Sequence, residues 1–400
     1  MHFTDRKKID QKTGRAINRR LILNLIRRNG PMSRSDLALR TGLSPAAVGF
    51  VVTDLLDDGY LIAGAPSQVG SGRRPVPLAL NVDGHLAVGL KAAPGRVDCI
   101  LADFGINTLE SRSVALTDRT PAGFVATTAE AIRSLLATHG GGRPVIGVGL
   151  SIPGRVVPDT GHCIRSHRFG WADVPIGPML SREVGLPVYV EDDTMAYGLA
   201  HHMFGLGQAC ENFAALAVGD GIGYAVIMDG KIRQGALGNA GKVGHVMHDA
   251  GGPMCECGRT GCLQAWYSFA ALESRWRETR ATKLLDALEK GAPEARAMVA
   301  EAGREIGRHL GEWVTVSDPE RIVLGGEAVA LGRVFIDAME AALAVGYFRE
   351  TAPPIVADES SYYWTAGAAA VAVQHVFDFE AAPSGSDEEL EHQPLSTIAP

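Results

Sequence analysis

Three cysteines fall within eight positions of the sequence, and their spacing constrains the local fold more strongly than any other feature. The run reads Cys255-x-Cys257-Gly-x-x-Gly-Cys262, and its glycines let the backbone turn tightly around an ion. Three thiolates and one imidazole form a closed tetrahedral set that suits a structural zinc. We therefore expect a zinc site with four ligands: His245, Cys255, Cys257 and Cys262. Two alternatives stay open on spacing alone, namely His248 as the fourth ligand, or three small buried cysteines without a metal.

The charge of the chain is divided unevenly along its length. The first 80 residues hold thirteen lysines and arginines against six acidic residues, so this segment carries +7 while the whole chain carries −7. A basic N-terminal segment on an acidic body is typical of a protein of which only one end meets nucleic acid. Six cysteines in 400 residues are too few for a disulfide scaffold, which favours a reducing cytoplasm. No long uncharged apolar run is present, so we expect no membrane span.

The N-terminal segment has the pattern of a helix-turn-helix. Apolar residues at helical spacing predict a helix over 15–29, which Gly30-Pro31 ends. Ser33 is a cap for a short second helix, with Leu37 and Leu39 expected in the core, and Ser44-Pro45 begins a third helix to Asp57. Two strands over 60–64 and 76–81 then enclose a basic, glycine-rich wing.

Small residues at the front of the third helix would let it approach the floor of the major groove, and the wing arginines would suit the minor groove. The alternative is a solvated basic hairpin on an ordinary three-helix module. The expected DNA contacts are Ser33, Arg34, Ser44, Pro45, Ala46, Ala47, Gly49, Thr53, Arg73 and Arg74.

From residue 85 onward, short apolar strands alternate with helical stretches, which predicts an α/β body. The expected helices cover 122–139, 194–204, 266–280, 294–316 and 331–345. The final tract over 380–400 is polar, acidic and rich in Pro and Ser, so we expect a disordered tail.

Over residues 13–378 the chain resembles the ROK family, and in particular its sugar-responsive regulators of the xylose-repressor and N-acetylglucosamine-repressor type. The resemblance rests on Gly-x-x-Gly-His over 241–245, the cysteine run and the N-terminal winged helix. It implies a two-lobed, actin-like ATPase fold, a sugar cleft between the lobes, the four zinc ligands above and His245 near the sugar. The expected domains are a winged helix-turn-helix over 1–82 and a ROK domain over 83–379. Lobe one is expected over about 83–195 with a C-terminal helix over 364–378, and lobe two over 196–363.

The phosphate-binding pattern of the family's kinases is altered in this chain. Asp193 matches the base that takes the proton of a sugar hydroxyl. In the first phosphate loop, Lys91 replaces a carboxylate expected near Mg²⁺, and Pro94 removes a backbone N–H. The second loop, over 219–223, carries the extra carboxylate of Asp220. We therefore expect no ATP binding and no catalysis; the alternative is an active ATP-dependent sugar kinase.

The resemblance also places an effector among Gly154, Asp192, Asp193, Lys242, His245 and Gln264. Two interpretations of this altered pocket stand side by side. Either the effector differs from plain glucose, as a sugar acid, phosphorylated sugar, amino sugar or polyol, or Lys242 and Asp192 form an internal salt bridge in a degenerate site. The expected protein is a cytoplasmic homodimer or homotetramer that binds a double-stranded operator as a repressor of carbohydrate genes. The sequence specifies neither the operator nor the effector.

Overall fold

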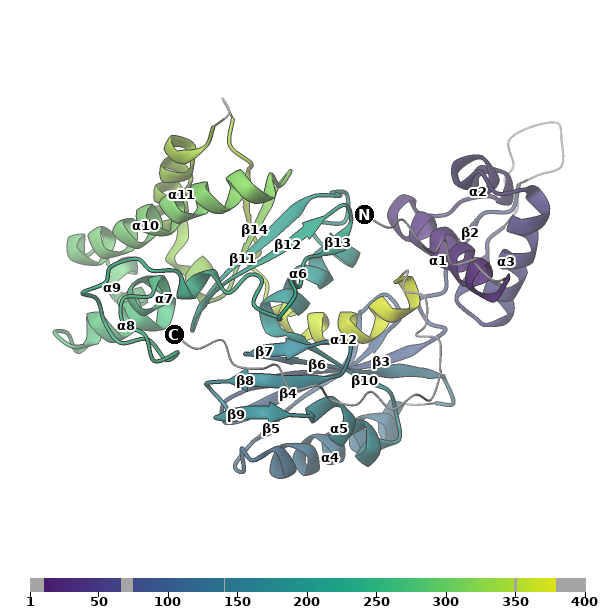
Figure 1. The fold of residues 1–400 in the computed structure, drawn as a ribbon, viewed down its shortest axis with the longest axis horizontal. Helices are drawn as coiled ribbons and strands as arrows, with labels where there is room; N and C mark the ends of the chain where they lie inside the picture. The colour runs from purple at the N-terminus through teal and green to yellow at the C-terminus, as the bar shows by residue number, and fades with distance from the viewer. Residues whose placement is uncertain (1–10, 66–74, 140, 349–350, 379–400) are drawn as a thin grey trace, which may run out of the picture.

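The computed structural model describes residues 11–65, 75–139, 141–348 and 351–378. It places a small helical module beside a body built on two separate sheets (Figure 1). The expected wing contacts Arg73 and Arg74, and the expected tail over 380–400, lie outside the described residues. Among these residues, no single helix is long and apolar enough to cross a membrane; one pair of helices, bent by 119°, passes that test jointly on length and composition.

The module has the predicted order of three helices and two strands. Its elements are α1 (Gln11–Asn29), α2 (Arg34–Thr41), α3 (Pro45–Asp57), β1 (Leu61–Ala63) and β2 (Leu78–Leu80). Ser33 and Asp36 cap α2 reciprocally, and Gly42 ends it in the left-handed region at φ 69°. Ser44 caps α3, with Pro45 in the first turn. These local signals fix the helix starts, which is why they could be predicted.

The apolar stripe of α2 is narrower than expected. Leu37 is buried, but Leu39 is 84% exposed, so its expected place in the core is wrong. Two positions along a helix correspond to about 200° of rotation, which puts the two leucines on opposite faces. The core of the module is continuous with that of the body, because Ile22 and Ile26 belong to the same cluster as Met203 and Phe377.

The first sheet of the body has the strand order β10-β6-β3-β4-β5. Its strands are β3 (Leu86–Ala93), β4 (Arg96–Asp103), β5 (Thr108–Ala115), β6 (Val145–Ile152) and β10 (Val188–Asp192). The pairs β3–β4 and β4–β5 are antiparallel, whereas β6 and β10 join in parallel. One face is covered by α4 (Pro121–His139) and α5 (Ile176–Val184), and a small sheet of β7 (Arg155–Val157), β8 (His162–Ser166) and β9 (Trp171–Val174) lies beside it.

The second sheet, of order β13-β12-β11-β14-β15, repeats this arrangement of three antiparallel and two parallel strands. Its strands are β11 (Phe213–Val218), β12 (Ile222–Met228), β13 (Lys231–Ile232), β14 (Ile322–Gly325) and β15 (Ile355–Ala357). Its helices are η1 (Val243–His245), α7 (Leu263–Tyr267), α8 (Phe269–Arg277), α9 (Leu284–Glu289), α10 (Pro293–Ser317), η2 (Glu327–Leu331) and α11 (Gly332–Gly346). The single helix expected over 266–280 is wrong, because the chain breaks at Ser268, whose side chain caps α8 by accepting from the Ala271 amide.

Two helices lie between the sheets: α6 (Asp193–Phe204) and α12 (Tyr362–Phe377), which is yellow in Figure 1. Each of these helices packs on the sheet that it does not follow in the chain. Helix α6 follows the first sheet but packs on β11 and β12, whereas α12 follows the second sheet but packs on β3 and β6. Small residues allow the close packing. A Cβ on Gly367 would lie 2.7 Å from the Ala196 carbonyl of α6, and one on Gly149 would collide with the Ala368 carbonyl of α12.

Candidate functional site

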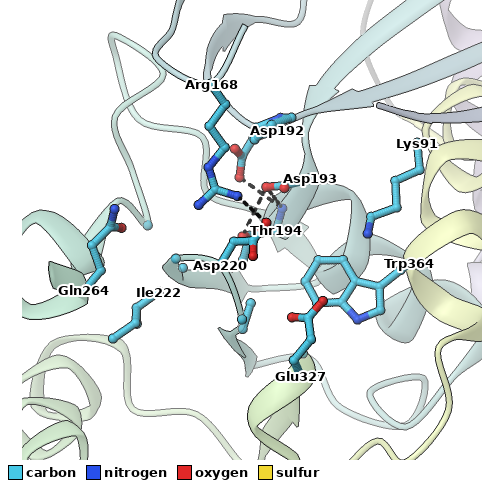
Figure 2. Close-up of a pocket in the computed structure, with 18 of the residues that line it drawn as sticks. Lys91, Arg168, Asp192, Asp193, Thr194, Asp220, Ile222, Gln264, Glu327 and Trp364 are labelled. Atoms are coloured by element: carbon cyan, nitrogen blue, oxygen red, sulfur yellow. Dashed lines mark hydrogen bonds and ion pairs between the residues drawn. The ribbon is translucent and has the colours of Figure 1, made fainter. Parts of the chain in front are cut away.

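A cavity of about 1290 Å³ opens between the two sheets, and the first residues of both α6 and α12 line it. Figure 2 shows its two ends. We call one the α6 end; it contains Gly154, Asp192, Asp193, Lys242, His245 and Gln264. We call the other the α12 end; it contains Lys91, Gly219, Asp220, Glu327 and Trp364. The structure thus brings together all six residues that the sequence assigned to an effector.

The α6 end is organised by the cap of its helix. Asp192 is 5% exposed, and its Oδ1 accepts from the amides of Thr194 and Met195 at 3.2 and 3.3 Å. The Lys242 ammonium donates to the other carboxylate oxygen of Asp192. Burial raises the pKa of Asp192, against the charge of Lys242. Burial by itself would lower the pKa of Lys242, but the charges of Asp192 and Asp193 raise it.

A second carboxyl lies directly behind this pair. Glu191 is 6% exposed; one of its oxygens accepts from the Asp192 amide at 2.8 Å and the other from the Gln234 side chain at 2.5 Å. Burial raises the pKa of Glu191 to about 7. The α6 end therefore gathers three carboxyl groups, at 191, 192 and 193, around Lys242, while the charge of Asp193 also acts on Arg168.

The α12 end carries acidic groups on a glycine turn. The turn joins β11 to β12, and the Arg168 guanidinium reaches Asp220 at 3.2 Å and Glu256 at 3.3 Å across it. The Glu327 carboxylate lies directly against Gly219, where an added Cβ would collide with it. The turn is thus in contact with the Glu327 carboxylate at Gly219 and with the Arg168 guanidinium at Gly221.

Lys91 lies near the end of β3 and lines the same cavity. Its ammonium is 4.9 Å from the centroid of the Trp364 ring, at the start of α12. Glu327 and Trp364 line the same cavity, and both are labelled in Figure 2. Beyond Lys91 the β3–β4 hairpin closes through Pro94-Gly95, and Gly95 has a φ of 92°. A lysine, an indole and a carboxylate therefore line the α12 end.

The cysteine run folds into a compact cluster at the edge of the cavity. The ligand atoms of His245, Cys255, Cys257 and Cys262 lie within 4.8 Å of one another. Cys255 Sγ is 3.5 Å from His245 Nδ1, and Cys257 Sγ is 3.7 Å from Cys262 Sγ. Tetrahedral zinc, with bonds of about 2.3 Å to sulfur and 2.0–2.1 Å to nitrogen, requires separations of about 3.8 and 3.5 Å between such atoms. The cluster therefore fits zinc.

Among the described residues, the alternative ligand His248 lies outside this cluster. Its Nδ1 is 3.3 Å from Nε2 of His309 on α10. The backbone of His245 is held in place by a hydrogen bond, because the Arg259 side chain donates to the His245 carbonyl at 2.9 Å. Burial lowers the pKa of the His245 imidazole. The same loop reaches the cleft, where the Gln264 amide donates to Glu256 at 3.0 Å.

The expected DNA contacts divide into accessible and buried residues. Arg34 and the front of α3, at Pro45 and Ala46, are exposed. Ser33 is 7% exposed and engaged in the cap of α2, so it is not free to reach a partner in this conformation. Helical periodicity did not single out Phe50, which is 67% exposed on α3 with the Arg15 guanidinium 5.7 Å from its ring. The sequence did contain a signal for Phe50, because it is a bulky apolar residue on a helix face that otherwise carries small residues.

Sequence reasoning also missed residues of the cleft. Trp364 and Glu327 come from helices far along the chain, and Glu256 was counted only as a spacer between cysteines. No local pattern marks them, because only the packing of α12, η2 and the cysteine loop brings them to the cavity.

Comparisons with known proteins agree with this architecture. The model of the ROK family matches residues 88–375, and the model described as winged helix-turn-helix DNA-binding matches residues 15–62. A xylose repressor of Caldicellulosiruptor bescii is 25% identical over 81% of this chain and 86% of its own length. The DNA-binding transcriptional dual regulator NagC of Escherichia coli is 26% identical over 89% of this chain and 92% of its own.

Among solved structures, a ROK family transcriptional regulator described as a homologue of the E. coli MLC protein superposes with a TM-score of 0.81. It covers 92% of this chain and 98% of its own at 23% identity, and so supports the fold. The matched family model spans well over half of the chain, including both sheets and the cavity between them. The chain is therefore a member of the ROK family that carries a winged helix-turn-helix module at its N-terminus.

Proposed function

We propose that this protein is a transcriptional repressor of carbohydrate genes whose affinity for an operator is set by a sugar or sugar derivative in the cleft. The observation that carries the proposal is the unequal make-up of the cleft. Its α6 end has the carboxylates and amide that hold sugar hydroxyls, and its α12 end has carboxylates on the turn that would face phosphates. Such a cavity suits a ligand without a triphosphate.

The DNA-binding part of the proposal is supported by the surface of α3. Pro45 and Ala46 are exposed and small, and Ser44 caps the helix so that its N-terminal turn is well formed. An α-helix whose first turn carries only small side chains can enter the major groove closely, with Phe50 projecting one turn further along. The basic wing sequence with Arg73 and Arg74 adds phosphate or minor-groove contacts. A homo-oligomer would present two such modules to a palindromic site.

Electrostatics argue against phosphoryl transfer. The repulsion between a phosphate charge and one negative charge about 4 Å away is roughly 1 kcal/mol in water and about 4 kcal/mol near a protein surface. Asp220, which pairs with Arg168, and Glu327 both border the turn over 219–223, and Lys91 replaces the carboxylate that the resemblance expects near Mg²⁺. Phosphoryl transfer depends mainly on positioned phosphates and metal, so Asp193 by itself does not make a kinase. The proposed protein is therefore not an enzyme.

A structural zinc completes the proposal. The four ligands His245, Cys255, Cys257 and Cys262 would hold it, and their spacing supports tetrahedral coordination. The metal would fix the loop that brings His245 to the cleft. Metal and effector are thus proposed to share one loop.

Binding to genomic DNA tests the regulator directly. The purified chain is incubated with sheared DNA of its own genome, and the retained fragments are sequenced. The proposal expects enrichment of fragments with a shared palindrome next to carbohydrate genes, with affinity that falls steeply as salt rises. Retention of no duplex, together with ADP formation from ATP and a hexose in a coupled assay, would establish the kinase alternative.

The effector class is tested by thermal unfolding with neutral, acidic, phosphorylated and amino sugars. A ligand that binds only the folded state raises Tm. The matched variant Asp193→Asn should lose the shift while keeping the basal Tm. If only acidic sugars raise Tm, we infer that the sugar carboxylate competes with Asp192 for Lys242. If only neutral sugars raise Tm, we infer that the Lys242–Asp192 ion pair stays intact as a fixed part of the pocket.

A further inference from the structure

The first helix of the module, α1, is bonded to the far ends of both helices that begin in the cleft. Asp193 and Thr194 start α6, Tyr362 and Trp364 start α12, and all four line the cavity. At 1.5 Å per residue, the 12 residues of α6 and the 16 of α12 carry these starts to ends about 18 and 24 Å away. Figure 1 shows α12 extending toward the module.

The first bonded contact is the α6 anchor, formed by Arg27 of α1 with the carbonyls of His202 and Met203. The guanidinium Nη1 donates to these oxygens at 3.3 and 2.7 Å. They are among the last four carbonyls of α6, which have no partner within the helix. Arg27 is 6% exposed, and the Gln208 side chain donates to its carbonyl at 2.9 Å. A buried cation thus caps the negative end of α6.

The second contact is the α12 anchor, formed by Asn24 of α1 with the carbonyl of Phe377. The Asn24 amide donates to this oxygen, in the last residue of α12, at 2.7 Å. The two anchors are linked, because the Arg27 guanidinium donates to Asn24 Oδ1 at 3.2 Å and lies 5.6 Å from the Phe377 ring centroid. One turn of α1 therefore contacts both helix ends.

The two helices are attached to different halves of the body. α6 packs on β11 and β12 of the second sheet, whereas α12 packs on β3 and β6 of the first. Their mutual contact combines the close approach of Gly367 to Ala196 with aromatic pairs, such as Tyr197 with Trp364 and Phe204 with Phe377, so any shift between the halves must slide these rings past one another. If the halves shift around a ligand, the ends of α6 and α12 shift relative to each other. One turn of a rigid helix cannot keep hydrogen bonds to both when that happens.

We propose that Arg27 and Asn24 are the positioning residues through which the state of the cleft reaches the DNA-binding module. Movement of the two halves breaks one of the two anchors and reorients α1, and with it the recognition helix α3 that shares its core. This inference rests on the proposed function. Because coupling between sites is reciprocal, operator DNA must also change the cleft.

Burial and the neighbouring Arg28 lower the pKa of Arg27 to about 10, so the guanidinium still carries its charge at neutral pH. A buried charge that loses its acceptors is strongly disfavoured, which makes the α6 anchor a two-state contact rather than a loose one. Arg28, one residue on, is the natural control. Its side chain is 32% exposed and pairs at 3.3 Å with Glu211, whose side chain is 71% exposed.

The experiment is hydrogen exchange on the full chain with and without a DNA duplex that the wild-type protein selects from a random-core library. The reporters are the amides of Thr194 and Met195, which Asp192 protects at the cleft end of α6. We expect DNA to change their exchange rates by about fivefold in the wild type. Arg27→Met should keep duplex binding but abolish this response, Arg27→Lys should restore part of it, and Arg28→Met should leave it intact.

Asn24→Ala removes the α12 anchor with a neutral side chain, so the proposal stays testable if Arg27→Met does not fold. It should also abolish the response at Thr194 and Met195. The inference is overturned if wild-type protein binds the duplex and the cleft amides do not respond, or if they respond equally in Arg27→Met and Asn24→Ala. Selection of no duplex at all would instead overturn the proposed function and this inference with it.

Discussion

The two ends of the cleft differ in how their charges are arranged. At the α6 end, Asp192 is bonded to two helix amides and to Lys242, so its charge is compensated within the protein. At the α12 end, Asp220 has Arg168 as a partner, whereas Glu327 lies against the glycine turn itself. Under the proposed function, the first end would hold hydroxyl groups, and the carboxylates of the second would disfavour the anion that such a turn binds in a kinase. The comparison teaches that carboxylates in one cleft can be held in two ways, by a cation and helix amides at one end and by direct packing on a backbone turn at the other.

The largest expected effect concerns the metal loop beside the α6 end. Cys257→Ser should lose bound zinc and lower the free energy of unfolding by on the order of 5 kcal/mol, because metal binding also folds the loop. Metal analysis and denaturant unfolding measure both quantities. Cys210→Ser, a buried cysteine outside the cluster, is the matched control and should keep the metal. Stoichiometric zinc in Cys257→Ser would contradict the ligand set.

The next effect tests the ion pair of the α6 end. Lys242→Met should lower the free energy of unfolding, measured with denaturant, by about 3 kcal/mol, because it leaves Asp192 buried beside Asp193 without its cationic partner. Asp192→Asn in the same chain should recover most of that loss, since asparagine keeps the cap of α6 and carries no charge. Additive losses in the double variant would show that the pair is not coupled.

A smaller effect is a pH dependence at Glu191. Its pKa is raised to about 7 in the folded chain, so the fold favours the protonated form. The stability that this group contributes is present below its ordinary pKa of about 4.5 and is lost as the pH rises toward 7. Glu191→Gln should therefore raise the free energy of unfolding by about 2 kcal/mol at pH 8 and change it little at pH 4.

Urea unfolding at the two pH values measures this difference. The amide can keep both hydrogen bonds if the Gln234 side chain turns over, which makes the substitution conservative. Glu289→Gln, on the exposed end of α9, should show no such dependence. If Glu191→Gln changed the free energy of unfolding equally at both pH values, burial of the Glu191 charge would not be the cause of the change.

The smallest effect concerns the α12 end. The double variant Asp220→Asn with Glu327→Gln should bind ATP about tenfold more tightly than the wild type in calorimetry, because two like charges are removed near the turn. It should still not phosphorylate a sugar, since Lys91 remains. Glu130→Gln, on the exposed face of α4, serves as the charge control. Tight ATP binding by the wild type would contradict the difference between the two ends.

Much of the module could be predicted because its signals are local. Ser33, Gly42 and Ser44 each determine a helix end through their own backbone and one neighbouring amide. The assignment of Leu39 to the core failed, because in so short a helix only packing decides which face is inside. The break at Ser268 was missed for a similar reason, since a serine cap inside an apolar pattern looks like a continuous helix.

For the site, the sequence determined which residues could hold a metal, because that depends on residue type and short spacing, whereas the effector residues came from the resemblance to the ROK family. Only the tertiary structure decided between His245 and His248, by turning the latter toward His309 on α10. It also formed the Lys242–Asp192 pair, set Glu327 against Gly219, and joined Arg27 to the end of α6. Each of these contacts joins segments tens to more than a hundred residues apart. Long-range packing fixes them, and local propensity carries no information about it.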